Sequence, residues 1–153
     1  MRADQGAHSV PRWMPAVLVA AGVYNLLFGA WAVLFPEMAF NGLGMDEPRY
    51  PFLWQCVGMI VGVYGIGYLA ASRAPLRHWP IVLVGMLGKI FGPIGFLQTA
   101  LAGDIPWSFG IMIIFNDLIW WIPFAGLLIA AWKAHHQQAP VESERWMHSN
   151  RLC

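Results

Sequence analysis

The sequence predicts an all-α integral membrane protein, a bundle of four antiparallel helices that run up and down through a bilayer with both termini in the cytoplasm. Three observations predict this fold class: the composition, four long apolar runs, and the distribution of Lys and Arg between them. The 153 residues are 58% hydrophobic and 11% charged, whereas soluble domains carry about 25% charged residues. A chain this short cannot hide so much apolar surface from water. We therefore expect the lipid bilayer to be its main partner.

The apolar runs cover residues 14–36, 51–72, 79–101 and 107–132. Each reaches the length of about 20 residues that a helix needs to cross the hydrocarbon core. Segments in lipid must satisfy their own backbone hydrogen bonds, so the runs predict helices, and a β-barrel would need shorter segments of alternating polarity. The first run is too long for a signal peptide and has no clear cleavage site after it, so we interpret it as a retained helix.

The links between the runs indicate the topology. They are short, at residues 37–50, 73–78 and 102–106, and short links favour antiparallel neighbours. Positive charge marks the cytoplasmic side of a membrane protein. Seven of the eight Lys and Arg outside the runs lie on one side: Arg2, Arg12, Arg73, Arg77, Lys133, Arg145 and Arg151.

This distribution predicts three parts in a multi-pass protein of the bacterial inner membrane. Residues 1–13 form a cytoplasmic N-terminal segment, residues 14–132 the transmembrane domain, and residues 133–153 a flexible cytoplasmic tail.

Glycines and prolines within the runs predict how the helices pack. Glycine stripes with GxxxG spacing allow backbones to approach closely in lipid, so Gly62→Leu or Gly88→Leu is expected to disrupt the bundle. Pro93 and Pro123 each remove a helical hydrogen bond, from the carbonyls of Lys89 and Ile119, and predict kinks. The stripes consist of Gly58, Gly62 and Gly65 in the second run, and of Gly85, Gly88, Gly92 and Gly95 in the third.

Two charged residues lie where lipid should exclude them. Lys89 is near the centre of the third run and Asp117 near the centre of the fourth, at similar distances from the link between them. An unpaired charge at this depth costs about 2.5–3.5 kcal/mol on insertion scales, so we expect the two to face each other. Asn25, Tyr64 and Asn116 lie at the same level. The pair is either an ion pair that fixes helix register or part of a ligand-binding or proton-handling site.

The fourth run is also rich in aromatic residues near Asp117. Bulky packing against kinked neighbours is the interpretation that we favour, and the alternative is the wall of a pocket for an apolar ligand such as a quinone, a pigment or a lipid. The candidate wall residues are Phe115, Trp120, Trp121 and Phe124.

Several kinds of site find no support in the sequence. The net charge of +1 argues against a nucleic-acid partner. The histidines lie outside or at the ends of the runs, which argues against a buried haem; a metal site of His78, His135 and His136 is a weak alternative, and we expect no metal. No nucleophilic triad, phosphate-binding glycine loop or pair of catalytic carboxylates is recognisable. No cofactor and no catalytic residue can be named, and we lean against an enzyme.

Three blocks carry a resemblance to a known family: WQCVGMIVGVYGIGYLAAS, RHWPIVLVGMLGKIFGPIGF and FNDLIWWIPFAGLL. They resemble an uncharacterised family of short bacterial membrane proteins, some of which are labelled "alkyl hydroperoxide reductase". The layout is also similar to that of DoxX-like four-helix membrane proteins, a likeness of architecture that carries no function. The cysteines do not favour peroxidase chemistry, because Cys56 lies within an apolar run without a basic partner nearby in sequence and Cys153 is on the tail.

The leading functional hypothesis is a small inner-membrane binding or accessory protein. Its central polar cluster would hold a small lipophilic or polar ligand, in support of a redox system. The alternatives are a proton-coupled carrier of a small solute, and a structural subunit in which the ion pair locks register; a second copy or a membrane subunit is a further candidate partner. The cluster consists of Asn25, Tyr64, Lys89, Asn116 and Asp117.

Overall fold

The protein is built from four long apolar helical segments. The structure, a computed structural model, describes residues 10–46 and 48–149, and the side chains of these residues up to 136. Three of the segments are the helices α1 (Trp13–Leu34), α3 (Pro51–Ala71) and α4 (Trp79–Ala102), and the fourth covers Trp107–His136. Each is long and apolar enough to cross a membrane. No strand occurs in the described ranges, so the all-α fold class and the four apolar helices are confirmed.

The fourth segment is interrupted near its middle. It begins with the short 3₁₀ turn η1 (Trp107–Phe109) and α5 (Gly110–Asn116), passes through a second 3₁₀ turn, η2 (Leu118–Trp120), and continues as α6 (Trp121–Ser149). Pro123 explains the interruption, because its ring would clash with the carbonyl of Ile119 and it has no N–H to donate. The predicted kink is therefore a break in the helix, and the break begins at Asp117. Helix α4, in contrast, continues through Pro93.

Two helical stretches lie where the sequence predicted none. The first link contains a short helix, α2 (Met38–Gly42). At the other end of the chain, α6 continues to Ser149, whereas a flexible tail was expected from residue 133.

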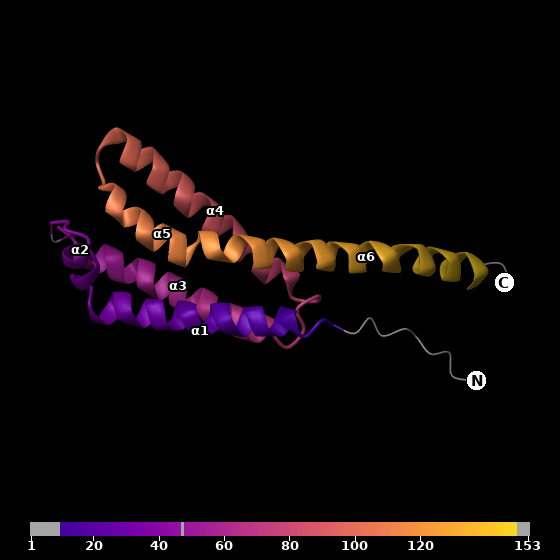
Figure 1. Cartoon of the computed structure of the whole chain (residues 1–153). Helices are drawn as coiled ribbons and strands as arrows, with labels where there is room; N and C mark the ends of the chain where they lie inside the picture. Colours follow the sequence, from indigo (N-terminus) through magenta and orange to yellow (C-terminus); the bar gives the residue numbers. More distant parts are fainter. Residues whose placement is uncertain (1–9, 47, 150–153) are drawn as a thin grey trace.

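Helices α1 and α3 lie side by side along their lengths (Figure 1). Glycines of both helices make the close approach possible: a Cβ at Gly29 would lie 2.6 Å from the carbonyl oxygen of Gly58, and one at Gly22 would lie 2.9 Å from that of Gly65. The sequence pattern identified the α3 side of this contact and missed the α1 side.

The predicted glycine stripes are only partly packing surfaces. A Cβ at Gly62, Gly88 or Gly95 would meet nothing within 4 Å. A Cβ therefore has room at positions 62 and 88, and the expectation that leucine there would disrupt the bundle stays a prediction without support from these contacts. On α4 the close contacts are at Gly85, next to the Tyr68 hydroxyl, and at Gly92, next to Asp117.

The hydrophobic core occupies the end of the molecule where the N-terminal parts of α1 and α4 meet α6. Figure 1 shows α4 leaning away from α1 and α3 toward the opposite end, which carries α2. The core therefore closes one end of the bundle. Its buried residues are Met14, Leu18, Ala21, Tyr68, Ala71, Val82, Phe124 and Leu127.

Candidate functional site

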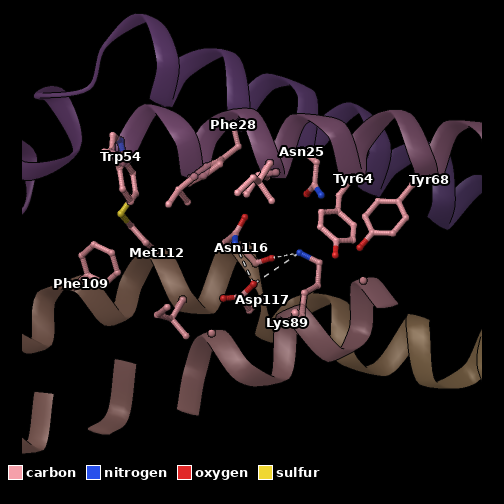
Figure 2. Close-up of a pocket in the computed structure, with 17 residues that line it drawn as sticks. Asn25, Phe28, Trp54, Tyr64, Tyr68, Lys89, Phe109, Met112, Asn116 and Asp117 are labelled. Atoms are coloured by element: carbon pink, nitrogen blue, oxygen red, sulfur yellow. Dashed lines mark hydrogen bonds and ion pairs between the residues drawn. The ribbon is translucent and has the colours of Figure 1, made fainter. Parts of the chain in front are cut away.

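A pocket of about 290 Å³ lies between α1, α3, α4 and α5. All five polar residues that the sequence singled out contribute to its wall, from four different parts of the chain (Figure 2). The lining residues are Asn25, Phe28, Trp54, Val57, Ile60, Val61, Tyr64, Tyr68, Gly85, Gly88, Lys89, Gly92, Phe109, Met112, Ile113, Asn116 and Asp117.

Lys89 and Asp117 face each other at one side of the pocket. The Lys89 Nζ lies 3.8 Å from Asp117 Oδ1, and the side chains are only 6% and 8% exposed. Lys89 lies in the middle of α4, and Asp117 directly follows the last residue of α5. The two opposite charges are thus buried together, as their positions in the sequence led us to expect.

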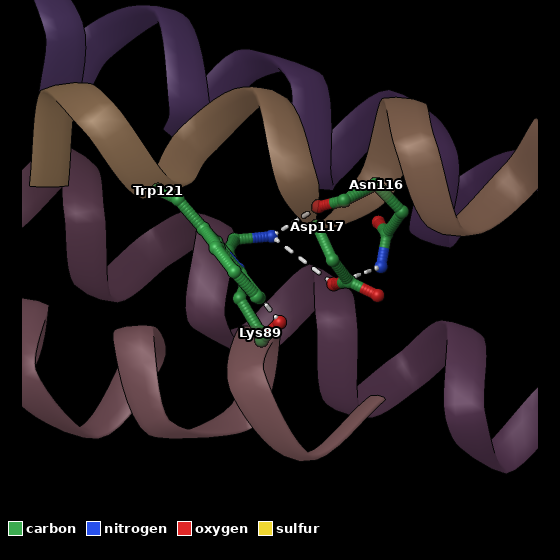
Figure 3. Close-up of polar contacts among 4 residues, drawn as sticks. All are labelled: Lys89, Asn116, Asp117 and Trp121. Carbon is green, nitrogen blue, oxygen red and sulfur yellow. Dashed lines mark hydrogen bonds and ion pairs between the residues drawn. The ribbon is translucent and has the colours of Figure 1, made fainter. Parts of the chain in front are cut away.

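Helix α4, which contains Pro93, and the fourth segment, which contains Pro123, each donate a hydrogen bond to the other next to this pair (Figure 3). Pro93 leaves the carbonyl of Lys89 without its helical donor, and the indole N–H of Trp121 donates to that oxygen at 3.0 Å. In the other direction, the Lys89 ammonium donates to the carbonyl oxygen of Asn116. In a regular helix the N–H of Trp120 would donate to the carbonyl oxygen of Asn116. Here it donates to the carbonyl oxygen of Asp117 instead, which leaves the Asn116 oxygen available to Lys89.

The amide of Asn116 connects to the ion pair on its other side. Its Nδ2–H donates to Asp117 Oδ1 at 3.0 Å. This bond fixes the orientation of the amide, since the opposite orientation would place an oxygen against the carboxylate. The amide oxygen of Asn116 is buried and has no hydrogen-bond partner.

Two further polar atoms of the pocket residues are buried without a partner. They are Oδ1 of Asn25, a residue only 2% exposed, and the indole Nε1 of Trp54. Buried polar atoms in native proteins are almost always hydrogen-bonded. Buried polar atoms without hydrogen-bond partners are therefore concentrated around this pocket.

Glycines of α4 explain why the pocket is open. Gly85, Gly88 and Gly92 line it without side chains that could fill it. At Gly88 a Cβ would meet nothing within 4 Å, whereas at Gly92 it would lie 2.8 Å from Asp117 Oδ2. Gly88 therefore leaves open space in the pocket, and Gly92 leaves space for the carboxylate of Asp117.

The other end of the pocket is aromatic. The ring of Trp54 packs edge-on against Phe28, Phe40 and Phe109, with centroid distances of 6.3, 5.4 and 6.4 Å. Figure 2 shows Trp54, Phe109 and Met112 grouped away from Lys89. The pocket therefore has one polar and one apolar end.

The aromatic wall differs from the one that the sequence suggested. None of the four residues named as the alternative wall lines the pocket, and packing was the favoured interpretation of them. Phe115 is 57% exposed and Phe124 is in the core, Trp120 packs against Tyr24 and Phe124, and Trp121 bonds to Lys89. The sequence reasoning missed Phe28, Trp54, Phe109 and Met112, because Trp54 resembles an interfacial anchor and nothing in the sequence pairs the other three with it.

His78, His135 and Cys56 do not line the pocket. No group of three or more His, Cys, Asp or Glu that could hold a metal occurs among the described residues. The His135 ring packs against Trp79 and its Nε2 lies 3.2 Å from the carbonyl oxygen of Leu76. Cys56 is a free, half-buried cysteine, and Cys153 lies outside the described residues.

Comparisons of the chain with protein families, with curated proteins and with solved structures found no match. The resemblance to the family of short bacterial membrane proteins, and that to DoxX-like proteins, stay predictions from the three sequence blocks. Function is therefore inferred from the geometry of the pocket.

Proposed function

We propose that the protein is a multi-pass protein of the bacterial inner membrane that binds a small amphiphilic ligand in the pocket. The observation that carries the proposal is the buried Lys89–Asp117 pair beside an open pocket of about 290 Å³ with unpartnered polar atoms. This volume is at the lower end of the range of about 300–1,000 Å³ for small-molecule sites. The protein would serve as a binding or accessory component rather than as an enzyme.

The outer surface supports a membrane location. Large apolar side chains such as Leu27, Leu101 and Ile122 are exposed, as lipid-facing residues are and as a soluble monomer would avoid over so wide an area. In the proposed topology the four segments are antiparallel, and the side rich in Lys and Arg faces the cytoplasm. The contacts of Gly22 with Gly65 and of Gly29 with Gly58 support opposite directions for α1 and α3.

A ligand site explains the polar cluster better than a register lock does. An ion pair that only fixes register should have its hydrogen bonds satisfied within the protein. Here the charged atoms are 3.8 Å apart, beyond hydrogen-bond distance. The amide oxygens of Asn25 and Asn116 have no partner, and each unsatisfied buried group costs about 1–3 kcal/mol. A ligand that bonds to these groups would offset that cost.

The test is mass spectrometry of small molecules that copurify with gently extracted protein. Gly88→Leu adds a side chain that points into open space in the pocket, and should remove the ligand without loss of folding. Gly95→Leu is the matched control, because it changes a glycine of the same helix that is equally free of contacts and does not line the pocket. A copurifying molecule retained equally by both variants, or absent from the unmodified protein, would count against the proposal.

A further inference from the structure

The buried polar atoms that lack a partner at the polar end of the pocket are amide oxygens, which accept hydrogen bonds. The amide oxygens of Asn25 and Asn116 lack donors, and they belong to α1 and α5, on two sides of the pocket. Figure 2 shows both amides directed into the space between these helices. Because the Asn116 amide is fixed by its bond to Asp117, its unpartnered atom is an oxygen. A ligand head that bonds to both oxygens as they are oriented here donates hydrogen bonds.

The charges around the pocket cancel. Lys89 and Asp117 are the only ionisable Lys, Arg, Asp or Glu among the lining residues, and they lie next to each other. Because the two charges cancel, an anionic or cationic head group at this end gains little net attraction to offset its loss of hydration. The pocket therefore favours a head group that is polar and neutral.

The remaining walls are apolar and reach the outside of the bundle. Phe28, Trp54 and Phe109 provide the aromatic end. Val57 and Ile60 line the pocket and are also 44% and 58% exposed. In the proposed membrane arrangement this rim faces lipid, so an apolar chain could extend from the pocket into the bilayer.

From these three features we infer that the ligand is a neutral amphiphile whose head group carries two hydrogen-bond donors, such as an alkyl diol. One hydroxyl donates to Asn25 and the other to Asn116, and the apolar chain lies along Trp54 and Phe109. This inference rests on the proposed function, since it names the ligand class for the same pocket.

The experiment compares two probes with the same chain, decane-1,2-diol and its dimethyl ether, in binding to the full chain in lipid nanodiscs. The ether fills similar space but cannot donate. A site built to bond to hydroxyls rejects an analogue that lacks them, so the diol should bind at least about tenfold more tightly. Asn25→Leu should reduce this preference severalfold and keep the protein folded, because it removes a buried polar atom that has no partner.

Charged probes and the Gly88→Leu variant distinguish a failure of the inferred ligand class from a failure of the proposed function. Decanoate and decylammonium should bind more weakly than the diol. Equal binding of diol and ether, tighter binding of either charged probe, or no binding of the diol would overturn the inferred ligand class. If Gly88→Leu still removes a natural copurifying molecule in any of these cases, the proposed function survives. If Gly88→Leu leaves diol binding unchanged, the probe is bound elsewhere and the inference fails.

Discussion

The indole N–H of Trp121 donates to the main-chain oxygen of Lys89 at a distance of 3.0 Å. This oxygen is the one that Pro93 deprives of its helical donor. The indole therefore replaces the missing helical donor at Lys89, whose side chain belongs to the buried ion pair. It links α4 to α6 and holds Lys89 in place opposite Asp117.

Trp121→Phe should lower the free energy of unfolding by about 1–3 kcal/mol, because it leaves a buried carbonyl without a donor. In a Pro93→Ala background the alanine N–H can supply the helical bond, so the same change at Trp121 should cost clearly less. Thermal unfolding of the four proteins in one detergent gives this coupling. Equal losses in both backgrounds would show that the indole matters only through packing.

Gly92→Ala should disturb the ion pair, because the added Cβ would lie 2.8 Å from Asp117 Oδ2. We expect reduced ligand retention and a net loss of about 1–3 kcal/mol in stability, as is typical of overpacking. Gly95→Ala, whose Cβ meets nothing within 4 Å, should be neutral or slightly stabilising through helix propensity. Unfolding and ligand retention are measured for both, and identical behaviour would mean that the carboxylate moves aside freely.

Gly29→Ala should weaken the contact between α1 and α3, since its Cβ would lie 2.6 Å from the Gly58 carbonyl oxygen. A backbone atom cannot move aside easily, so a loss of about 1–3 kcal/mol is expected. The control is Gly62→Ala on α3, where the Cβ would meet nothing within 4 Å. Melting temperatures in detergent decide the matter, and a Gly29 variant as stable as the Gly62 variant would refute the described interface.

Much of the fold could be predicted from the sequence, because runs long and apolar enough to cross a membrane are typical of helices. Length and hydropathy were enough for the four helical segments, and the cost of isolated charges in lipid was enough to place Lys89 opposite Asp117. The break at Asp117 was harder to locate. Pro123 predicted a disturbance, but whether a helix bends or breaks depends on the donors and acceptors that neighbouring helices offer.

The details of the site depend on side-chain directions that periodicity does not give. Gly62 and Gly88 look like members of packing stripes, yet the direction in which a Cβ would point from each is open. Trp54 looks like an interfacial anchor, yet it forms the aromatic end of the pocket. Neither feature can be read from one helix alone, because the rotation of each helix about its axis is set by its neighbours and not by its own sequence.

The central claim, that the buried pair serves a ligand and not only helix register, is tested most directly by replacing both charges. Removal of one partner leaves an unpaired buried charge and should cost about 3–5 kcal/mol, whereas replacement of both by apolar residues is often close to neutral. Lys89→Met combined with Asp117→Leu should therefore fold as well as the unmodified protein and lose the copurifying molecule in mass spectrometry. A double variant that folds and retains that molecule in full would contradict the account.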